Sequence, residues 1–250
     1  MKYFSASRLK IDRAKKHIND LNEMIRAFAV DSYTLSIQRD AQFGYDCVQI
    51  DTTQSVPDDF APVIGDALHN LRSSLDLAIN EIVFNHFTIY DDYTVFPFRK
   101  TRDDLVAAIK GAKIYQASKE VCDFILNIVK PYKGGNDALW ALHDLNILDK
   151  HRLLVPFMQV TAVNDIVAED DRGAKIVIGT WAITRNRTAT HECVGHANIK
   201  ITNKGKATLM VLFDDGMPME GCAVVETLIQ FTELVSGVLD GIERVLIAEK

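Results

Sequence analysis

Two stretches of the chain combine leucines with the residue types that carry acid–base and charge-stabilising chemistry. The first is Ile64–Glu81, read IGDALHNLRSSLDLAINE, and the second is Leu139–Leu153, read LWALHDLNILDKHRL. Histidines and carboxylates can move or orient protons, and arginines can stabilise negative charge. The pattern therefore indicates a candidate site, whose catalytic residues we take to be His69, Arg72, Asp76, Asp149, His151 and Arg152.

The first stretch predicts a helix with two distinct faces. At about 100° per residue, its apolar residues share one face and are expected in the core; they are Ile64, Ala67, Leu68, Leu71, Leu75, Ala78, Ile79 and Ile82. The opposite face carries a polar stripe made of Asp66, His69, Ser73, Asp76 and Asn80, with Arg72 beside it. Short polar side chains are poor helix formers, so the stripe favours fixed partners over a solvated surface, which is the alternative.

The second stretch predicts a buried helix. Its apolar residues cover nearly every face, and they are Leu139, Trp140, Ala141, Leu142, Leu145, Ile147 and Leu148. Buried charges cost several kcal/mol each unless they are paired. We therefore expect the polar residues of this helix to pair with Asp66, His69, Arg72 and Asp76.

The two motifs resemble those of a bacterial family of uncharacterised proteins. The run IGDALHNLRSSLD is similar to a family motif of the form GDALHNLRSALDHL, and LWALHDLNILDKHRLL is similar to LHxLNxxDKHR. The later FPF and the upstream YTLSIQRD agree with the same family. The resemblance covers roughly residues 33–155, implies a bacterial or phage source, and brings no established activity.

The family-like form RSALDH also resembles the Arg-x4-His signature of HEPN-type ribonucleases, helical proteins that cleave RNA without metal. Arg72 matches the arginine, whereas Leu77 stands at the histidine position, so His69 or His151 would take the acid–base role. The resemblance implies that this histidine moves the 2′-hydroxyl proton and that Arg72 stabilises charge on the phosphate. Asp149 or Asp76 would orient the histidine.

A metal site is the first alternative at these residues. His143 and Asp144, with the stripe carboxylates, supply ligand types that helical bundles use. Arg72, Lys150 and Arg152 would, however, place positive charge beside a cation. The run His191–His196, read HECVGH, contains further ligand types without the spacing of a zinc protease. We expect no metal and no cofactor, and a charge-paired network without catalytic role is the other alternative.

Composition limits the classes of protein to which the chain can belong. The chain has 250 residues, 48% of them hydrophobic, and a formal charge of −6, which argues against a surface uniformly suited to nucleic acid. Its four cysteines are scattered and predict no disulfide framework, so a cytoplasmic location is expected. No run approaches the roughly 20 apolar residues that span a bilayer, so neither secretion nor membrane insertion is expected.

Periodicity predicts an α+β protein. Residues 1–153 are expected to form a helical bundle with a β-hairpin at about 33–52, and residues 154–215 an antiparallel β-rich segment. Residues 216–250 are expected to form a long C-terminal helix that packs back on the bundle. Asp171-Arg172-Gly173 and Asn203-Lys204-Gly205 predict hairpin turns.

Two functions from different classes fit these patterns. The first is HEPN-like, metal-independent RNA cleavage in a bacterial defence or toxin setting. The second is a non-catalytic protein-interaction module in which a buried polar network fixes the helices. The partners considered are RNA, a partner protein and a second copy of the chain.

Overall fold

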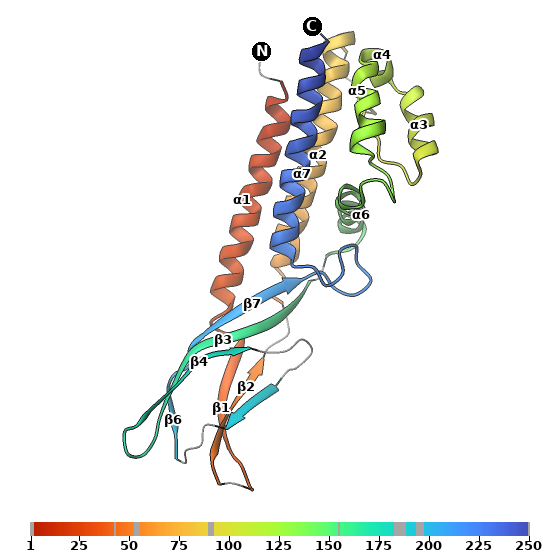
Figure 1. Ribbon diagram of the computed structural model, residues 1–250. Coiled ribbons are helices and arrows are strands. Elements are labelled where there is room, and N and C mark those ends of the chain that lie inside the picture. The colour runs from red at the N-terminus through yellow and green to blue at the C-terminus, as the bar shows by residue number, and fades with distance from the viewer. Residues whose placement is uncertain are drawn as a thin grey trace. The chain divides into compact units, whose positions relative to one another are not determined.

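The computed structural model describes residues 3–42, 44–52, 56–89, 93–154, 156–182, 189–193 and 198–249, with only the backbone of residues 52 and 189–193 (Figure 1). It confirms a mixed α+β protein. Contacts divide the chain into two units. The helical unit comprises Met1–Leu21, Ala61–Leu154 and Asp215–Lys250, and the β unit comprises Asn22–Phe60 and Val155–Asp214. The early hairpin therefore groups with the later strands.

Three long helices provide the core of the helical unit: α1 (Ser5–Phe28), of which the part up to Leu21 belongs here, α2 (Phe60–Phe87) and α7 (Val224–Ala248). The eight apolar residues predicted for the core face of α2 are all buried. On α7 the apolar stripe from Val224 to Ile242 is buried as well. Arg8 of α1 bonds Asp240 and Glu243 of α7, so charged side chains also join these helices.

Shorter helices follow α2, and side-chain caps set several of their starts. They are α3 (Arg102–Lys110), α4 (Lys113–Ala117), α5 (Lys119–Phe124), the π-helix η1 (Ile125–Val129) and α6 (Asp137–His151). Thr101 accepts from the backbone N–H of Asp104, and Asn136 accepts from that of Leu139. Each bond satisfies a donor that a helix start leaves free.

The prediction of a helix buried on all sides is wrong for α6. Leu139, Leu142 and Leu145 are buried, but Ile147 is 40% exposed and Trp140 is partly exposed. Ile147 fits the apolar spacing of the helix, but spacing alone does not show whether another element covers that face. The helix therefore has one buried face, and its polar residues are not all enclosed.

Two antiparallel sheets form the β unit. The hairpin β1 (Tyr33–Arg39) and β2 (Asp46–Thr52) is joined by β5 (Ala189–Cys193), in the order β1-β2-β5. In the second sheet β3 (Phe157–Glu169) pairs with β4 (Lys175–Ala182), β6 (Lys200–Asn203) and β7 (Lys206–Leu212). Buried residues from both sheets, among them Tyr33, Ile50, Val163 and Trp181, form one hydrophobic core.

One of the two predicted hairpin turns is confirmed and the other is wrong. Asp170–Ala174 turns β3 into β4, with Gly173 at a φ of 81°. Across Asn203-Lys204-Gly205, by contrast, β6 and β7 do not pair with each other; both pair with β3, opposite its successive parts. Gly205 has a φ of 78° and lies against the carbonyl of Asn164, which leaves no room for a Cβ. The glycine therefore marks a break within one edge of the sheet.

The cysteines differ from the sequence expectation at one position. Cys47 takes part in a disulfide bond, whereas Cys122 and Cys222 are free. The register of β2 with β5 places residue 47 opposite residue 193. The spacing of cysteines along the sequence does not predict which distant strands pair, so this proximity could not be expected. Burial raises the pKa of the Cys122 thiol to about 12, which makes it a poor nucleophile at neutral pH.

None of the helices that the structure describes is both long and apolar enough to pass through a bilayer.

Two glycines of α7 provide a matched test of its packing. A Cβ at Gly241 would lie 2.9 Å from Cε1 of Phe124 and closer still to Cζ, whereas a Cβ at Gly237 would meet nothing within 4 Å. Gly241→Ala should lower the free energy of unfolding by about 1–3 kcal/mol through overpacking. Gly237→Ala should raise it by up to about 1 kcal/mol through helix propensity. Urea denaturation of both variants checks this, and equal effects would contradict the close packing of α5 on α7.

Candidate functional site

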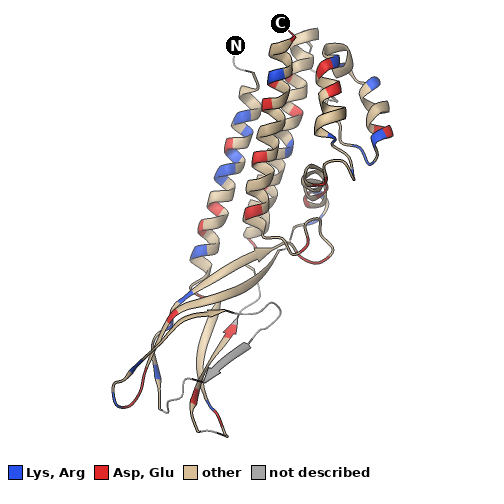
Figure 2. Ribbon diagram, in the orientation of Figure 1, with Lys and Arg blue, Asp and Glu red and all other residues tan. Residues whose placement is uncertain are grey.

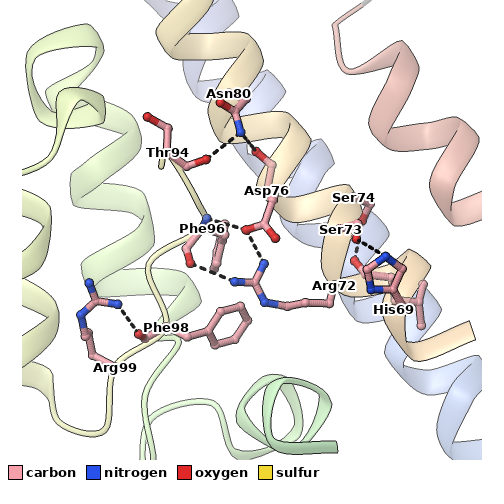
Figure 3. Close-up of polar contacts among 11 residues, drawn as sticks. His69, Arg72, Ser73, Ser74, Asp76, Asn80, Thr94, Phe96, Phe98 and Arg99 are labelled. Carbon is pink, nitrogen blue, oxygen red and sulfur yellow. Dashed lines mark hydrogen bonds and ion pairs between the residues drawn. The ribbon is translucent and has the colours of Figure 1, made fainter. Parts of the chain in front are cut away.

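The ion pair between Arg72 and Asp76, one turn apart on α2, is the centre of the candidate site (Figure 3). The Arg72 guanidinium also donates to the carbonyl of Phe96 at 3.3 Å, and the backbone N–H of Phe96 donates to Asp76 Oδ1 at 2.8 Å. One turn further, Asn80 Nδ2 donates to the carbonyl of Thr94 at 2.6 Å. Arg72 and two residues of the polar stripe, Asp76 and Asn80, therefore bind the backbone of the segment 94–96.

Aromatic rings continue this network from α2 to α6. The Arg72 guanidinium carbon lies 4.6 Å from the ring centroid of Phe98. The Phe98 ring stacks on His143 of α6, with centroids 4.4 Å apart and an interplanar angle of 2°. Trp140 lies beside the same imidazole at 5.3 Å. Phe98 thus contacts a cation from one helix and a histidine from another.

His143 is held as a neutral base in this position. Its pKa is lowered from 6.5 to about 4, first by burial and then by the positive charges of Arg72, Lys150 and Arg99. Its Nδ1 is buried and has no hydrogen-bond partner among the described residues. At neutral pH the ring therefore adds no second cation beside Arg72, and it is a weak general base.

The N-terminal half of the stripe faces the end of α6 instead. A Cβ at Gly65 would lie 2.5 Å from Asp149 Oδ1, so the Asp149 carboxylate occupies the space that the glycine leaves. Burial raises the pKa of Asp149, the negative charge of Asp66 raises it further, and His69 lowers it. His69 itself is exposed, and its Nε2 lies 3.3 Å from the hydroxyl of Ser73 (Figure 3). The exposed His69 and Asp66 therefore both act electrostatically on the partly buried carboxylate of Asp149.

The six predicted site residues thus fall into separate groups. Arg72 and Asp76 bind the segment 94–96, whereas His69 and Asp149 interact electrostatically nearer the start of α2. His151 and Arg152 are exposed at the end of α6, where the backbone N–H of Arg152 closes the helix on the carbonyl of Leu148. No hydrogen bond or ion pair of their side chains with the other four occurs among the contacts of the described residues.

Sequence reasoning missed the aromatic segment that the polar stripe binds. Phe96 and Phe98 belong to the FPF motif, and its signal was two aromatic residues around a proline directly after a polar loop. No protein-family model, curated protein or solved structure matches the chain. The chemistry of the site is therefore inferred from its geometry.

The described side chains include no group of three His, Cys, Asp or Glu residues that could hold a metal ion. The motif His191–His196 lies outside the residues whose side chains the structure describes.

A double-mutant cycle tests the contact between α2 and α6. Gly65→Ala should destabilise the protein, because the new methyl group displaces the Asp149 carboxylate. In an Asp149→Ala background the same change should stabilise it by up to about 1 kcal/mol, since alanine is the better helix former. Thermal denaturation of the four proteins measures the coupling. Additive effects would show that the two residues do not touch.

The pKa of His143 predicts a pH dependence of stability. Below its ordinary pKa of 6.5 the unfolded chain binds a proton at this histidine, whereas the folded protein does so only near pH 4. The free energy of unfolding should therefore fall as the pH drops from about 6.5 to about 4, and His143→Gln should lose that part of the fall. Urea denaturation across this range measures it. Identical pH profiles for the two proteins would contradict a neutral, buried imidazole.

Proposed function

We propose that the chain is a non-catalytic protein-interaction module in which the Arg72–Asp76 network holds the segment Tyr93–Phe98 for a partner protein. The burial of Arg72 carries this proposal. The residue is 8% exposed, and Asp76, the Phe96 carbonyl and the Phe98 ring surround its guanidinium. An arginine so engaged cannot contact a phosphate without breaking these interactions, so its role is to position the segment.

The segment that Arg72 and Asp76 hold presents apolar side chains outward. Tyr93 is 92% exposed and Val95 is 49% exposed, whereas Phe96 and Phe98 are buried. Aromatic residues are enriched at protein interfaces, because they bury a large area at a small cost in conformational entropy. A segment whose backbone is already fixed loses little further freedom on binding. Both features support a preformed contact surface for another protein.

Metal-independent RNA cleavage is the second candidate, and one observation favours it. His69 is exposed and interacts electrostatically with Asp149, so an acid–base residue type and a carboxylate occur in the same region. Because Arg72 is engaged elsewhere, the exposed Arg152 would have to stabilise the charge on phosphate.

Site-specific photocrosslinking tests the interaction module. A photoreactive phenylalanine analogue in place of Tyr93 should give one discrete protein adduct in the cells that make this protein. The same analogue at Ile128, which is exposed on η1, is the matched control and should not give that adduct. Asn80→Ala should weaken the adduct at position 93, because it frees the Thr94 carbonyl at a cost of about 1–3 kcal/mol. The same adduct from both positions would contradict the proposal.

Incubation of the purified protein with total RNA in EDTA separates the two candidates. If the protein is an interaction module, the RNA should stay intact with both the wild-type protein and the His69→Ala variant. Cleavage in EDTA that His69→Ala abolishes, while its melting temperature stays unchanged, would replace the module by the ribonuclease.

A further inference from the structure

We infer that two copies of the chain associate through the hollow between α1 and α7 of the helical unit, so that α1 of each copy packs on α7 of the other. This surface goes beyond the proposed interaction of the segment Tyr93–Phe98. The hollow has a volume of about 200 Å³, and its lining consists of Lys15, Ile18, Asn19, Ile229, Thr232 and Glu233. It is smaller than the roughly 300–1,000 Å³ usual for small-molecule sites, so it suits single side chains of a protein partner.

An exposed isoleucine stands beside this hollow. Ile18 and Thr232 line it and are almost fully buried, whereas Ile229, which also lines it, is 45% exposed. The hydroxyl of Thr232 donates to the carbonyl of Leu228 at 2.8 Å, so it needs no further hydrogen-bond acceptor. Burial of the Ile229 side chain against another helix would therefore remove apolar surface from water without leaving this hydroxyl unpaired.

The two helices that form the hollow have opposite net charges. Up to Leu21, α1 carries five basic and two acidic residues, whereas α7 carries four acidic residues and one basic residue (Figure 2). Part of this difference is used within the chain, where Arg8 bonds Asp240 and Glu243. The charges beside the hollow are different residues.

Lys15 and Glu233 are the charged residues beside the hollow, and both are exposed. Glu233 has no ion pair with any residue that the structure describes. Lys15 pairs with Asp12 at 3.5 Å, but both side chains are more than half exposed, and such surface pairs contribute little. A cation on α1 and a carboxylate on α7 are therefore available to a partner of matching charge.

The directions of α1 and α7 determine how a second copy fits. Arg8 of α1 bonds Asp240 of α7. Lys15, further along α1, lies at the hollow with Glu233, which comes earlier on α7, so the two helices are antiparallel. A two-fold axis along the hollow keeps every residue at its level and places α1 of the second copy over α7 of the first.

This symmetry brings complementary groups together. Lys15 of each copy then faces Glu233 of the other, and Ile229 of each copy lies against the hollow of the other. The four helices form an antiparallel bundle, which is a common way for helices to bury one face. A second copy therefore meets both the exposed isoleucine and the available charges with a single surface.

Sedimentation equilibrium over a range of protein concentrations tests the inference by charge reversal. The wild-type protein should form dimers whose Kd rises with salt, because the charged contacts lie at the surface. Lys15→Glu and Glu233→Lys should each raise the Kd about tenfold or more, since the two-fold axis turns two attractive contacts into two repulsive ones. An equimolar mixture of the two variants should dimerise again, because both contacts of a mixed pair join opposite charges. Unfolded variants could not show this recovery.

Arg13→Glu is the matched control, because Arg13 is an exposed cation of α1 that does not line the hollow, and the variant has the same net charge as Lys15→Glu. It should change the Kd by less than about threefold. A wild-type protein that stays monomeric at every concentration, or a mixture that dimerises no better than Lys15→Glu alone, would overturn the inference and leave the hollow to a different protein. Dimerisation does not depend on whether Tyr93 crosslinks to a partner protein, so the two proposals fail separately.

Discussion

The burial of a single guanidinium governs the polar structure of the helical unit. Arg72 is surrounded by protein, so its charge requires both an opposite charge and hydrogen-bond acceptors. Asp76 supplies the charge from the same helix, and the carbonyl of Phe96 supplies an acceptor from a segment 24 residues away in sequence. Asp76 also accepts from the backbone N–H of Phe96, so the carboxylate that neutralises Arg72 also fixes the segment at Phe96. Loss of Arg72 or of Asp76 would therefore leave the other side chain without its ionic partner and would weaken the attachment of the segment.

The charge of Arg72 also restricts what α6 can place beside it. Phe98 offers the guanidinium a ring face, and the other ring stacked on Phe98 belongs to His143. A protonated imidazole there would be a buried cation near Arg72, so the surroundings lower its pKa to about 4. A neutral ring packs as an aromatic side chain instead. The candidate site is thus held by aromatic contacts as much as by ion pairs.

Local signals in the sequence predicted more of this structure than long-range ones did. The core face of α2 follows from spacing over a few residues, and its eight apolar residues are buried. The prediction of a hairpin turn at Asn203–Gly205 was wrong because the flanking strands pair with β3, which lies some 35 residues earlier, and not with each other. The polar stripe was expected to need fixed partners, but half of those partners are backbone groups of the segment 94–96. Backbone groups have no residue type, so no pattern could reveal them.

The stripe on α2 has two different roles along its length, and this limits the reactions it can support. His69 and Arg72 are one turn apart, yet His69 contacts Ser73 and interacts with Asp149, whereas Arg72 is committed to Asp76 and Phe96. Acid–base catalysis needs a histidine within about 3 Å of its proton and a charge stabiliser at the same reacting group. Arg72 could meet that need only by leaving a buried ion pair, which costs about 3–5 kcal/mol when one partner is removed. The C-terminal half of the stripe therefore binds the backbone of the segment 94–96, whereas Asp66 and His69 in the other half are exposed.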